Sequence, residues 1–196
     1  MLSLDRTNTN LIGQWWWTVD RWTLAAIMLL IFFGVLLIMA ASPAVATQHH
    51  WSSFHFIKKH IIFLIPTIGM LIGVSLLSLR DIRRFAYVVF GLSMLGLVLT
   101  PFMGTDIKGA SRWLEIGGIS FQPSEFVKPA FAVICAWLFS KKHMNSAFPG
   151  NLFAFGLYLL VVTFLLLQPD LGMTVLITLM WFSQFFLSGL PLMWIF

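Results

Sequence analysis

Residues 24–41 read LAAIMLLIFFGVLLIMAA, and this uninterrupted apolar run of eighteen residues decides the fold class of the chain. The preceding Arg21 and the following residues 44–46 (AVA) resemble the ends of a cleaved secretory signal. The apolar part of such a signal is only about 7–15 residues long, whereas a helix of about 20 residues crosses the hydrocarbon core of a bilayer. The sequence therefore predicts an uncleaved transmembrane helix here.

Further apolar segments follow this one along the chain. The full set is 22–42, 60–78, 85–103, 124–140, 151–168 and 171–188. Each is close to the spanning length, and backbone groups in lipid must pair within their own segment, which favours helices. We therefore predict an all-α fold, a polytopic transmembrane helix bundle of about six helices in a single domain over residues 1–196. Pro191 and the apolar residues after it indicate the start of a seventh helix, and we expect the chain to be the N-terminal part of a longer protein whose C-terminal part is missing.

The composition of the chain is typical of a membrane protein. Of its 196 residues, 59% are hydrophobic and only 10% are charged, whereas a soluble domain has about 25% charged residues. The net charge is +5, but the basic residues stand in short loops, where they set membrane topology. No nucleic-acid-binding motif is found, so no nucleic acid is expected as a partner. The single Cys135 lies in an apolar run, which excludes a disulfide within one chain.

The loop charges predict the orientation of the helices. With a cytoplasmic N-terminus, the inner side holds seven Lys or Arg residues and the outer side five. The inner set includes the dense loop 80–84 and the pair at 141–142, which are the better markers because short cytoplasmic loops are enriched in Lys and Arg. We therefore predict a cytoplasmic N-terminus. This orientation places two polar stretches, 104–123 and 168–172, on the same outer face.

Residues 104–128, GTDIKGASRWLEIGGISFQPSEFVK, form a polar segment between two apolar runs, with three of the twelve Lys and Arg residues and three of the seven Asp and Glu residues. Charges beside hydrocarbon cost about 3 kcal/mol each, so such residues usually carry function. Lys108, Arg112 and Lys128 offer the point charges and the planar fork that bind phosphate oxygens. The alternative is that Lys108 and Arg112 are loop charges that contact lipid headgroups, with Trp113 as an interfacial residue rather than a wall of a site.

The end of the polar segment predicts a helix start. Pro123 suits the first turn of a helix, and Ser124 and Glu125 suit the same turn, where the helix dipole favours a carboxylate. Glu125 and Lys128 then stand three residues apart on one face and are expected to form an ion pair that makes Lys128 tolerable within the membrane. This pairing does not exclude a functional role for Lys128.

Asp170 is the only carboxylate between residues 126 and 196. It stands in residues 168–172 (QPDLG), where Pro169 and Gly172 interrupt the helical pattern. One interpretation is a catalytic or ion-binding carboxylate at a broken helix. The interpretation that we favour is an N-cap, because Asp just before an apolar run accepts hydrogen bonds from the first backbone N–H groups of a helix.

Four histidines stand close together in the sequence: His49, His50, His55 and His60. Such a cluster could bind a metal ion. No recognisable ligand spacing and no nearby Asp, Glu or Cys accompanies it, which favours a solvated outer loop. No metal site is predicted.

Two motifs resemble the signatures of a known family. Residues 108–114 (KGASRWL) and 121–128 (FQPSEFVK) are similar to the first signature of the SEDS family of cell-shape and cell-division proteins, and residues 168–172 (QPDLG) are similar to the second. The resemblance runs from the first predicted helix to the sixth, and the Trp-rich start together with residues 40–44 is more similar to the division branch than to the elongation branch. One difference is that the family usually has Thr where this chain has Met173.

The resemblance implies a function. Family members polymerise lipid II into glycan strands at the outer face of the bacterial cytoplasmic (inner) membrane, and the division branch works at the septum with a class B penicillin-binding protein and other divisome proteins. A peptidoglycan glycosyltransferase that binds lipid II and membrane lipids is therefore expected. A lipid II flippase and a non-catalytic divisome scaffold are the alternatives. The scarcity of charges in the first three predicted helices favours the enzyme over the flippase.

The resemblance also implies roles for individual residues. The expected substrate-binding residues are Lys108, Arg112, Gln122, Glu125 and Lys128. The expected structural residues are Trp113, Pro123, Ser124, Gln168, Pro169, Asp170 and Gly172. Cations would stabilise the leaving diphosphate, and a base must accept the proton of the attacking sugar hydroxyl.

The family's catalytic carboxylate lies in a later outer loop. The catalytic residue is therefore unknown here and is expected beyond Phe196, and residues 1–196 alone are expected to be inactive. No cofactor is firmly implied, although a divalent cation could bind at the diphosphate.

Overall fold

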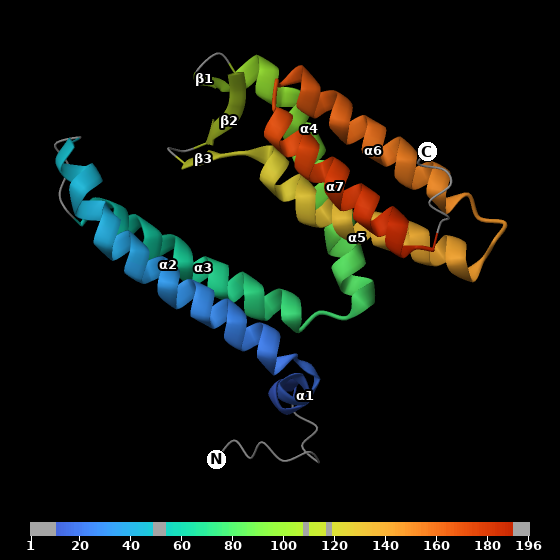
Figure 1. Cartoon of the computed structure of the whole chain (residues 1–196), viewed down its shortest axis with the longest axis horizontal. Coiled ribbons are helices and arrows are strands. Elements are labelled where there is room, and N and C mark those ends of the chain that lie inside the picture. The colour runs from blue at the N-terminus through green and yellow to red at the C-terminus, as the bar shows by residue number, and fades with distance from the viewer. Residues whose placement is uncertain (1–10, 49–53, 108–109, 117–118, 190–196) are drawn as a thin grey trace. The chain divides into compact units, whose positions relative to one another are not determined.

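A computed structural model of the chain describes residues 11–48, 54–107, 110–116 and 119–189 (Figure 1). Its helices are α1 (Leu11–Thr18), α2 (Arg21–Gln48), α3 (His55–Ser75), α4 (Leu79–Met103), α5 (Pro123–Met144), α6 (Gly150–Leu167) and α7 (Leu171–Leu187). Three short strands lie between α4 and α5, and they are β1 (Thr105–Ile107), β2 (Ala110–Ile116) and β3 (Ile119–Phe121).

A helix occupies each of the six apolar segments that the sequence singles out, from α2 to α7. Two features were not predicted from the sequence, the short helix α1 and the strands in the polar segment. The predicted start of a further helix at Pro191 lies outside the described residues.

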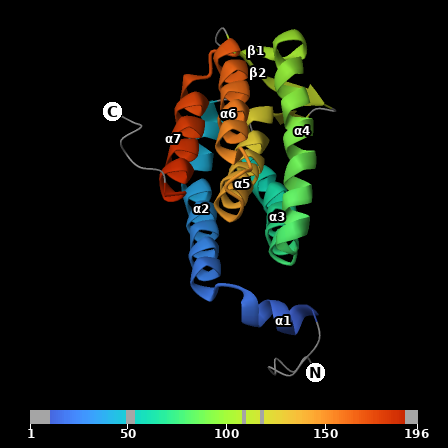
Figure 2. The same ribbon diagram turned by 90° about the vertical axis from the view of Figure 1, so that its right-hand side faces the viewer.

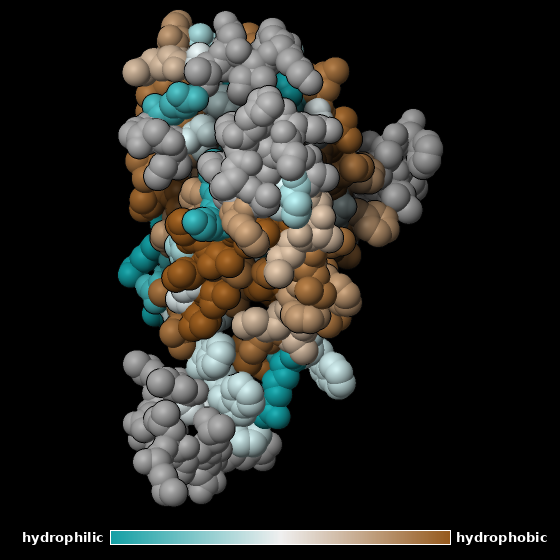
Figure 3. Space-filling model, turned by 90° about the vertical axis from the view of Figure 1, so that its left-hand side faces the viewer, coloured by the Kyte–Doolittle hydropathy of each residue, from teal (hydrophilic) through white to brown (hydrophobic). Residues whose placement is uncertain are grey.

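Four stretches of the described helices are long and apolar enough to cross a membrane: Arg21–Pro43, Phe56–Ser75, Leu79–Met103 and Gly150–Leu167. α7 is apolar but shorter. α5 has the length, but polar residues in its first and last turns lower its hydropathy. Large apolar side chains such as Leu30 (71% exposed) and Ile65 (69% exposed) stand on the helix surfaces, and apolar residues make up much of the face seen in Figure 3. This surface requires lipid, and the chain is a multi-pass helical membrane protein.

The chain divides into two compact units, of which the first ends at Leu77. Here α2 and α3 pack side by side as an antiparallel pair, and Trp15 of α1 donates a hydrogen bond of 2.8 Å to Ser75 at the end of α3. Asp20 precedes α2 and accepts hydrogen bonds from the Thr23 hydroxyl and the Trp22 N–H. These bonds lower the pKa of Asp20, because they stabilise its ionised form.

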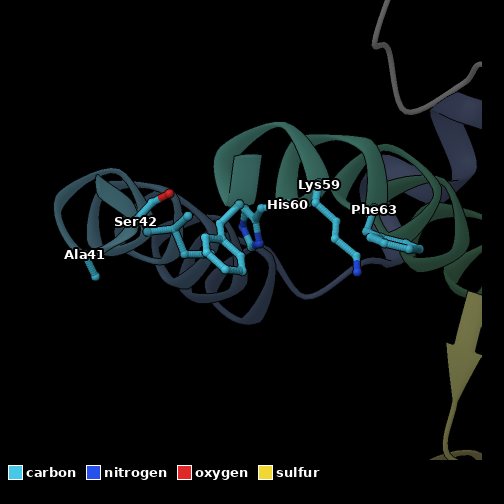
Figure 4. Close-up of a pocket in the computed structure, with 7 residues that line it drawn as sticks. Ala41, Ser42, Lys59, His60 and Phe63 are labelled. Atoms are coloured by element: carbon cyan, nitrogen blue, oxygen red, sulfur yellow. The ribbon is translucent and has the colours of Figure 1, made fainter. Parts of the chain in front are cut away.

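A hollow of about 460 Å³ opens between α2 and α3. Its lining is mostly apolar and consists of Ile38, Ala41, Ser42, Phe56, Lys59, His60 and Phe63. His60 and Lys59 stand on the α3 side of this hollow (Figure 4). His49 and His50 of the histidine cluster lie outside the described residues. The described residues hold no group of three or more His, Cys, Asp or Glu that could bind a metal ion.

The second unit begins at Ser78 and is built around α5. α5 packs against α4, α6 and α7 (Figures 1 and 2). Its buried residues recur at helical spacing, as Val127, Phe131, Cys135 and Leu138 do, and Phe131 and Cys135 are fully buried. An apolar face of this kind along a helix packs against neighbouring helices rather than lipid.

Two glycines mark close contacts of α5. A Cβ at Gly150 would overlap the carbonyl oxygen of Leu138, so the start of α6 touches the backbone of α5. A Cβ at Gly96 would lie 3.0 Å from the ring of Pro123, so α4 passes close to the first turn of α5. Both contacts fix the helices near the two ends of α5.

Cations and aromatic rings gather at the end of the second unit that is opposite to the strands. The guanidinium of Arg83 lies 5.2 Å from the ring of Trp137, and the Lys141 amine lies 5.0 Å from the same ring and 4.3 Å from that of Phe148. Cation–π contacts of this kind stabilise an interface. The two basic clusters on which the orientation prediction rests thus share one end of the unit.

Candidate functional site at the break between α6 and α7

The polar segment folds into a small antiparallel sheet of order β1–β2–β3. Thr105 of β1 pairs with Trp113, and Leu114 of β2 pairs with Phe121. Leu114 is buried against the helices, whereas its neighbours Trp113 and Glu115 are exposed, the alternation that a sheet with one buried face requires. The sheet therefore presents one side of β2 to α4 and α5.

The α6–α7 break, residues 168–170, is the second element of the site. Asp170 is the N-cap of α7, because its Oδ1 accepts a hydrogen bond of 3.3 Å from the Met173 N–H. Its carbonyl also accepts bonds from the N–H and the hydroxyl of Thr174, at 3.0 and 2.8 Å. The predicted cap is confirmed.

Two side chains of the polar segment reach this break. Gln122 donates from Nε2 to Asp170 Oδ2 at 3.2 Å. Arg112 donates from Nη2 to the Pro169 carbonyl at 2.7 Å, and its Nη1 lies 3.9 Å from Asp170 Oδ1. The two polar stretches that the sequence places on one face thus meet in direct contact.

These contacts explain how a carboxylate persists in an apolar bundle. The Asp170 side chain is only 6% exposed, and an isolated buried charge would be very costly. Hydrogen bonds from Gln122 and Met173 and the nearby guanidinium of Arg112 compensate this cost. Asp170 therefore acts as the centre of a structural cluster.

Arg112 has a different placement from the one expected for a free phosphate ligand. Its fork faces Pro169 and Asp170, and its Nε is buried without a hydrogen-bond partner among the described residues. The side chain remains 38% exposed, so the protein does not enclose it completely. The first role of Arg112 is consequently to join β2 to the α6–α7 break.

Gln168 holds the break from the other side. It is buried, and its Nε2 donates to the carbonyl of Leu97 in α4 at 2.6 Å. This contact joins α4 to the C-terminal end of α6. Nothing in the sequence motif pointed to Leu97, because the two residues are 71 positions apart.

The first turn of α5 matches the prediction. Pro123 occupies the first position, and Lys128 Nζ lies 2.5 Å from Glu125 Oε2. The side chain of Lys128 is 20% exposed and that of Glu125 is 50% exposed, so the pair stands at the rim of the unit. Ser124 is buried, and its hydroxyl has no hydrogen-bond partner among the described residues.

Comparison with known proteins shows to which family the chain belongs. The family described as cell cycle protein (FtsW/RodA/SpoVE) matches residues 20–196. The chain belongs to this family. Its sequence is 41% identical over 191 residues to the probable peptidoglycan glycosyltransferase FtsW of Caulobacter vibrioides, covering 97% of this chain and 49% of that protein.

Solved structures of FtsW/RodA/SpoVE proteins agree with this assignment. Rod shape determining protein RodA of Thermus thermophilus matches with a TM-score of 0.66 and 28% identity, over 89% of this chain and 56% of that one. A chain of a peptidoglycan synthase complex, solved to describe the coordination of polymerization and crosslinking, matches with a TM-score of 0.60 and 28% identity, over 81% and 48%. The chain spans about half the length of the relatives that it matches.

The remaining predicted site residues of this FtsW/RodA/SpoVE chain have simple placements. Lys108 lies outside the described residues. Trp113 is on the exposed face of β2, and Gly172 lies in the first turn of α7 close to Asp170. The structure thus brings together Arg112, Gln122 and the α6–α7 break, while the Glu125–Lys128 pair stands in the first turns of α5, which follow Gln122.

Proposed function

We propose that this chain is part of a peptidoglycan glycosyltransferase that polymerises lipid II at the outer face of the bacterial cytoplasmic membrane during cell division. The observation that carries this proposal is the 41% identity, over 97% of the chain, to a protein named a probable peptidoglycan glycosyltransferase FtsW. We further propose a single transmembrane domain over residues 1–196, a cytoplasmic N-terminus and a location at the septum. In this orientation the polar cluster faces the outer leaflet, where a lipid-linked sugar is presented. The cluster is formed by β2, the start of α5 and the α6–α7 break.

The proposed substrate contacts use the cations that retain exposed surface. Polymerisation releases a lipid diphosphate, whose charge is stabilised by positive groups aimed at it. Arg112, at 38% exposure, and Lys128, at 20% exposure, can each offer part of their charge to such a group, and Lys108 precedes β2. Glu125 holds Lys128 in place. Gln122 donates to Asp170, and its carboxamide keeps a second N–H and its oxygen for the proposed contact with the substrate.

The proposed partner is a class B penicillin-binding protein. The support is the similarity to a chain of a peptidoglycan synthase complex. For the whole protein we also propose other divisome proteins as partners and a divalent cation bound at the diphosphate.

The test uses the full-length protein, purified with its penicillin-binding partner and supplied with labelled lipid II. Glycan polymer on a gel is the expected product. Arg112→Ala and Lys128→Ala should each lower the rate about 100-fold or more, because removal of one donor aimed at a developing oxyanion costs about 2.7–4 kcal/mol. Normal polymerisation by either variant would remove that residue from the site.

The same preparation separates the alternative functions. Transbilayer movement of lipid II in liposomes, without any polymer, would favour a flippase and reject the enzyme. Neither movement nor polymer, with normal binding of the partner, would favour a scaffold. Arg112→Lys is the informative control, because Lys keeps the charge but lacks the planar fork that Arg112 directs at Pro169 and Asp170.

A further inference from the structure

A proline within α4 leaves one backbone carbonyl without its helical donor. In an α-helix the N–H of each residue donates to the carbonyl four positions earlier. Pro101 lies inside α4 and has no N–H, so the carbonyl of Leu97 lacks this partner. Leu97 is fully buried, so water does not supply a substitute, and an unpaired carbonyl there would be costly.

A local side-chain alternative for this carbonyl is already used. The hydroxyl of Thr100, which is one candidate, donates to Gly96 at 2.6 Å. The N–H of Gly104 donates to Thr100 at 2.8 Å, so the helical hydrogen bonding continues past the proline. The donor that does reach Leu97 is the Gln168 carboxamide, at 2.6 Å.

We propose that Gln168 is a positioning residue, which holds the α6–α7 break in place by supplying to Leu97 the hydrogen bond that Pro101 removes from α4. The carboxamide of Gln168 is buried and comes from the end of another helix, so this bond is a tether as well as a replacement. Asp170 follows two positions later and contacts Gln122, and Pro169 contacts Arg112. A displacement of Gln168 would therefore move the whole cluster.

The functional part of this inference rests on the proposed glycosyltransferase activity. Catalytic groups and substrate contacts tolerate little displacement, since a misplacement of about 1 Å can reduce a rate about 100-fold. Loss of the tether should therefore reduce polymerisation even where the protein stays folded. The bond itself can be tested without any activity.

The experiment compares four forms of the full-length protein: wild type, Gln168→Met, Pro101→Ala and the double variant. Methionine fills the space of Gln168 but has no donor. Pro101→Ala restores the backbone N–H opposite the Leu97 carbonyl. We expect Gln168→Met to lower the melting temperature, and the double variant to regain most of this loss because the carbonyl has a partner again.

Polymerisation with the penicillin-binding partner should behave differently. Gln168→Met should reduce the rate about tenfold or more, and the double variant should stay low, because Pro101→Ala pairs the carbonyl but does not tether α6. A double variant that recovers activity together with stability would overturn the positioning role. Wild-type melting and wild-type activity in Gln168→Met would overturn the inference entirely.

A matched control and an activity-free readout complete the test. Gln184 of α7 donates to the Ala132 carbonyl at 3.1 Å. This carbonyl keeps an ordinary helical donor, because the residue four positions later, Ala136, has an N–H. Gln184→Met should therefore lower the melting temperature less than Gln168→Met.

Spin labels at Phe102 and Leu171, which are 83% and 68% exposed, should show a broader distance distribution in Gln168→Met and in the double variant. If wild type forms no polymer, the proposed function fails, while melting and spin-label distances still decide on the tether.

Discussion

Asp170 illustrates at the scale of one residue how a polar group is kept in an apolar bundle. Its Oδ1 caps α7, its Oδ2 accepts from Gln122, and Arg112 lies nearby. With these interactions in place the carboxylate is 6% exposed, which leaves little surface for a substrate. A structural role at the start of α7 follows, and the proton-accepting base must be sought elsewhere.

Replacement of Asp170 tests this role. Asp170→Ala should destabilise the protein by about 2–4 kcal/mol, because the cap is worth about 1 kcal/mol and the unpaired Gln122 donor costs about 1–3 kcal/mol more. Asp170→Asn should cost less, since Asn is also a good N-cap. The measurement is thermal unfolding of the full-length protein in detergent.

Asp81 provides the matched control. Its side chain is 50% exposed, and it lies 3.8 Å from Arg84. Exposed pairs of this kind are worth about 0–1 kcal/mol. Equal losses of stability in Asp81→Ala and Asp170→Ala would contradict the account of the buried cluster.

The site was predictable from the sequence only in its local parts. The cap at Asp170 and the Glu125–Lys128 pair follow from spacings of one to four residues, which a helix fixes. The contacts of Arg112 with Pro169 and of Gln168 with Leu97 join positions 57 and 71 residues apart. Such contacts depend on how helices pack, and no local pattern in one sequence specifies that.

At the scale of elements, the helices were predictable because length and apolarity suffice to identify a spanning segment. The sheet was missed because the polar segment was interpreted as a charged loop. A signal was present, since the glycines of Lys108-Gly109 and Gly117-Gly118 separate short runs of the kind that form hairpins. The strands are three to seven residues long, too short for periodicity to decide.

The contact between α5 and α6 gives a prediction at this scale. Gly150→Ala should destabilise the protein by about 1–3 kcal/mol, because the new methyl group would overlap the Leu138 carbonyl and force the two helices apart. Gly156, in the middle of α6, has open space around it. Gly156→Ala should be neutral or stabilising by about 0.5–1 kcal/mol, since alanine favours the helix.

Melting temperatures of both glycine variants check this. The two substitutions are chemically identical and lie on one helix, so general effects of alanine cancel. A loss in both variants, or in neither, would show that the close approach of α6 to the α5 backbone does not hold.

At the scale of the whole molecule, the orientation in the membrane can be tested directly. Glu115 is exposed on β2, and Met144 is 85% exposed at the opposite end of α5. With a cytoplasmic N-terminus, a membrane-impermeant maleimide should label Glu115→Cys from outside the cell and Met144→Cys only after permeabilisation. The native Cys135 is fully buried and serves as the unlabelled background. The reverse pattern would invert the proposed topology and place the polar cluster in the cytoplasm.

The last prediction concerns residues 1–196 expressed without the rest of a full-length relative. Two carboxylates near the polar cluster have partners within the chain. Asp170 accepts hydrogen bonds from Gln122 and Met173, and Glu125 forms an ion pair with Lys128. Glu115, in contrast, is exposed on β2. Because Asp170 is almost fully buried and Glu125 is paired with Lys128, neither is placed to reach a substrate hydroxyl, and we expect this chain to insert into membranes but to form no glycan from lipid II with the partner present. Glu115→Gln in the full-length protein should leave the polymerisation rate unchanged. Polymer from residues 1–196 alone, or loss of polymer in Glu115→Gln, would place the base within this chain.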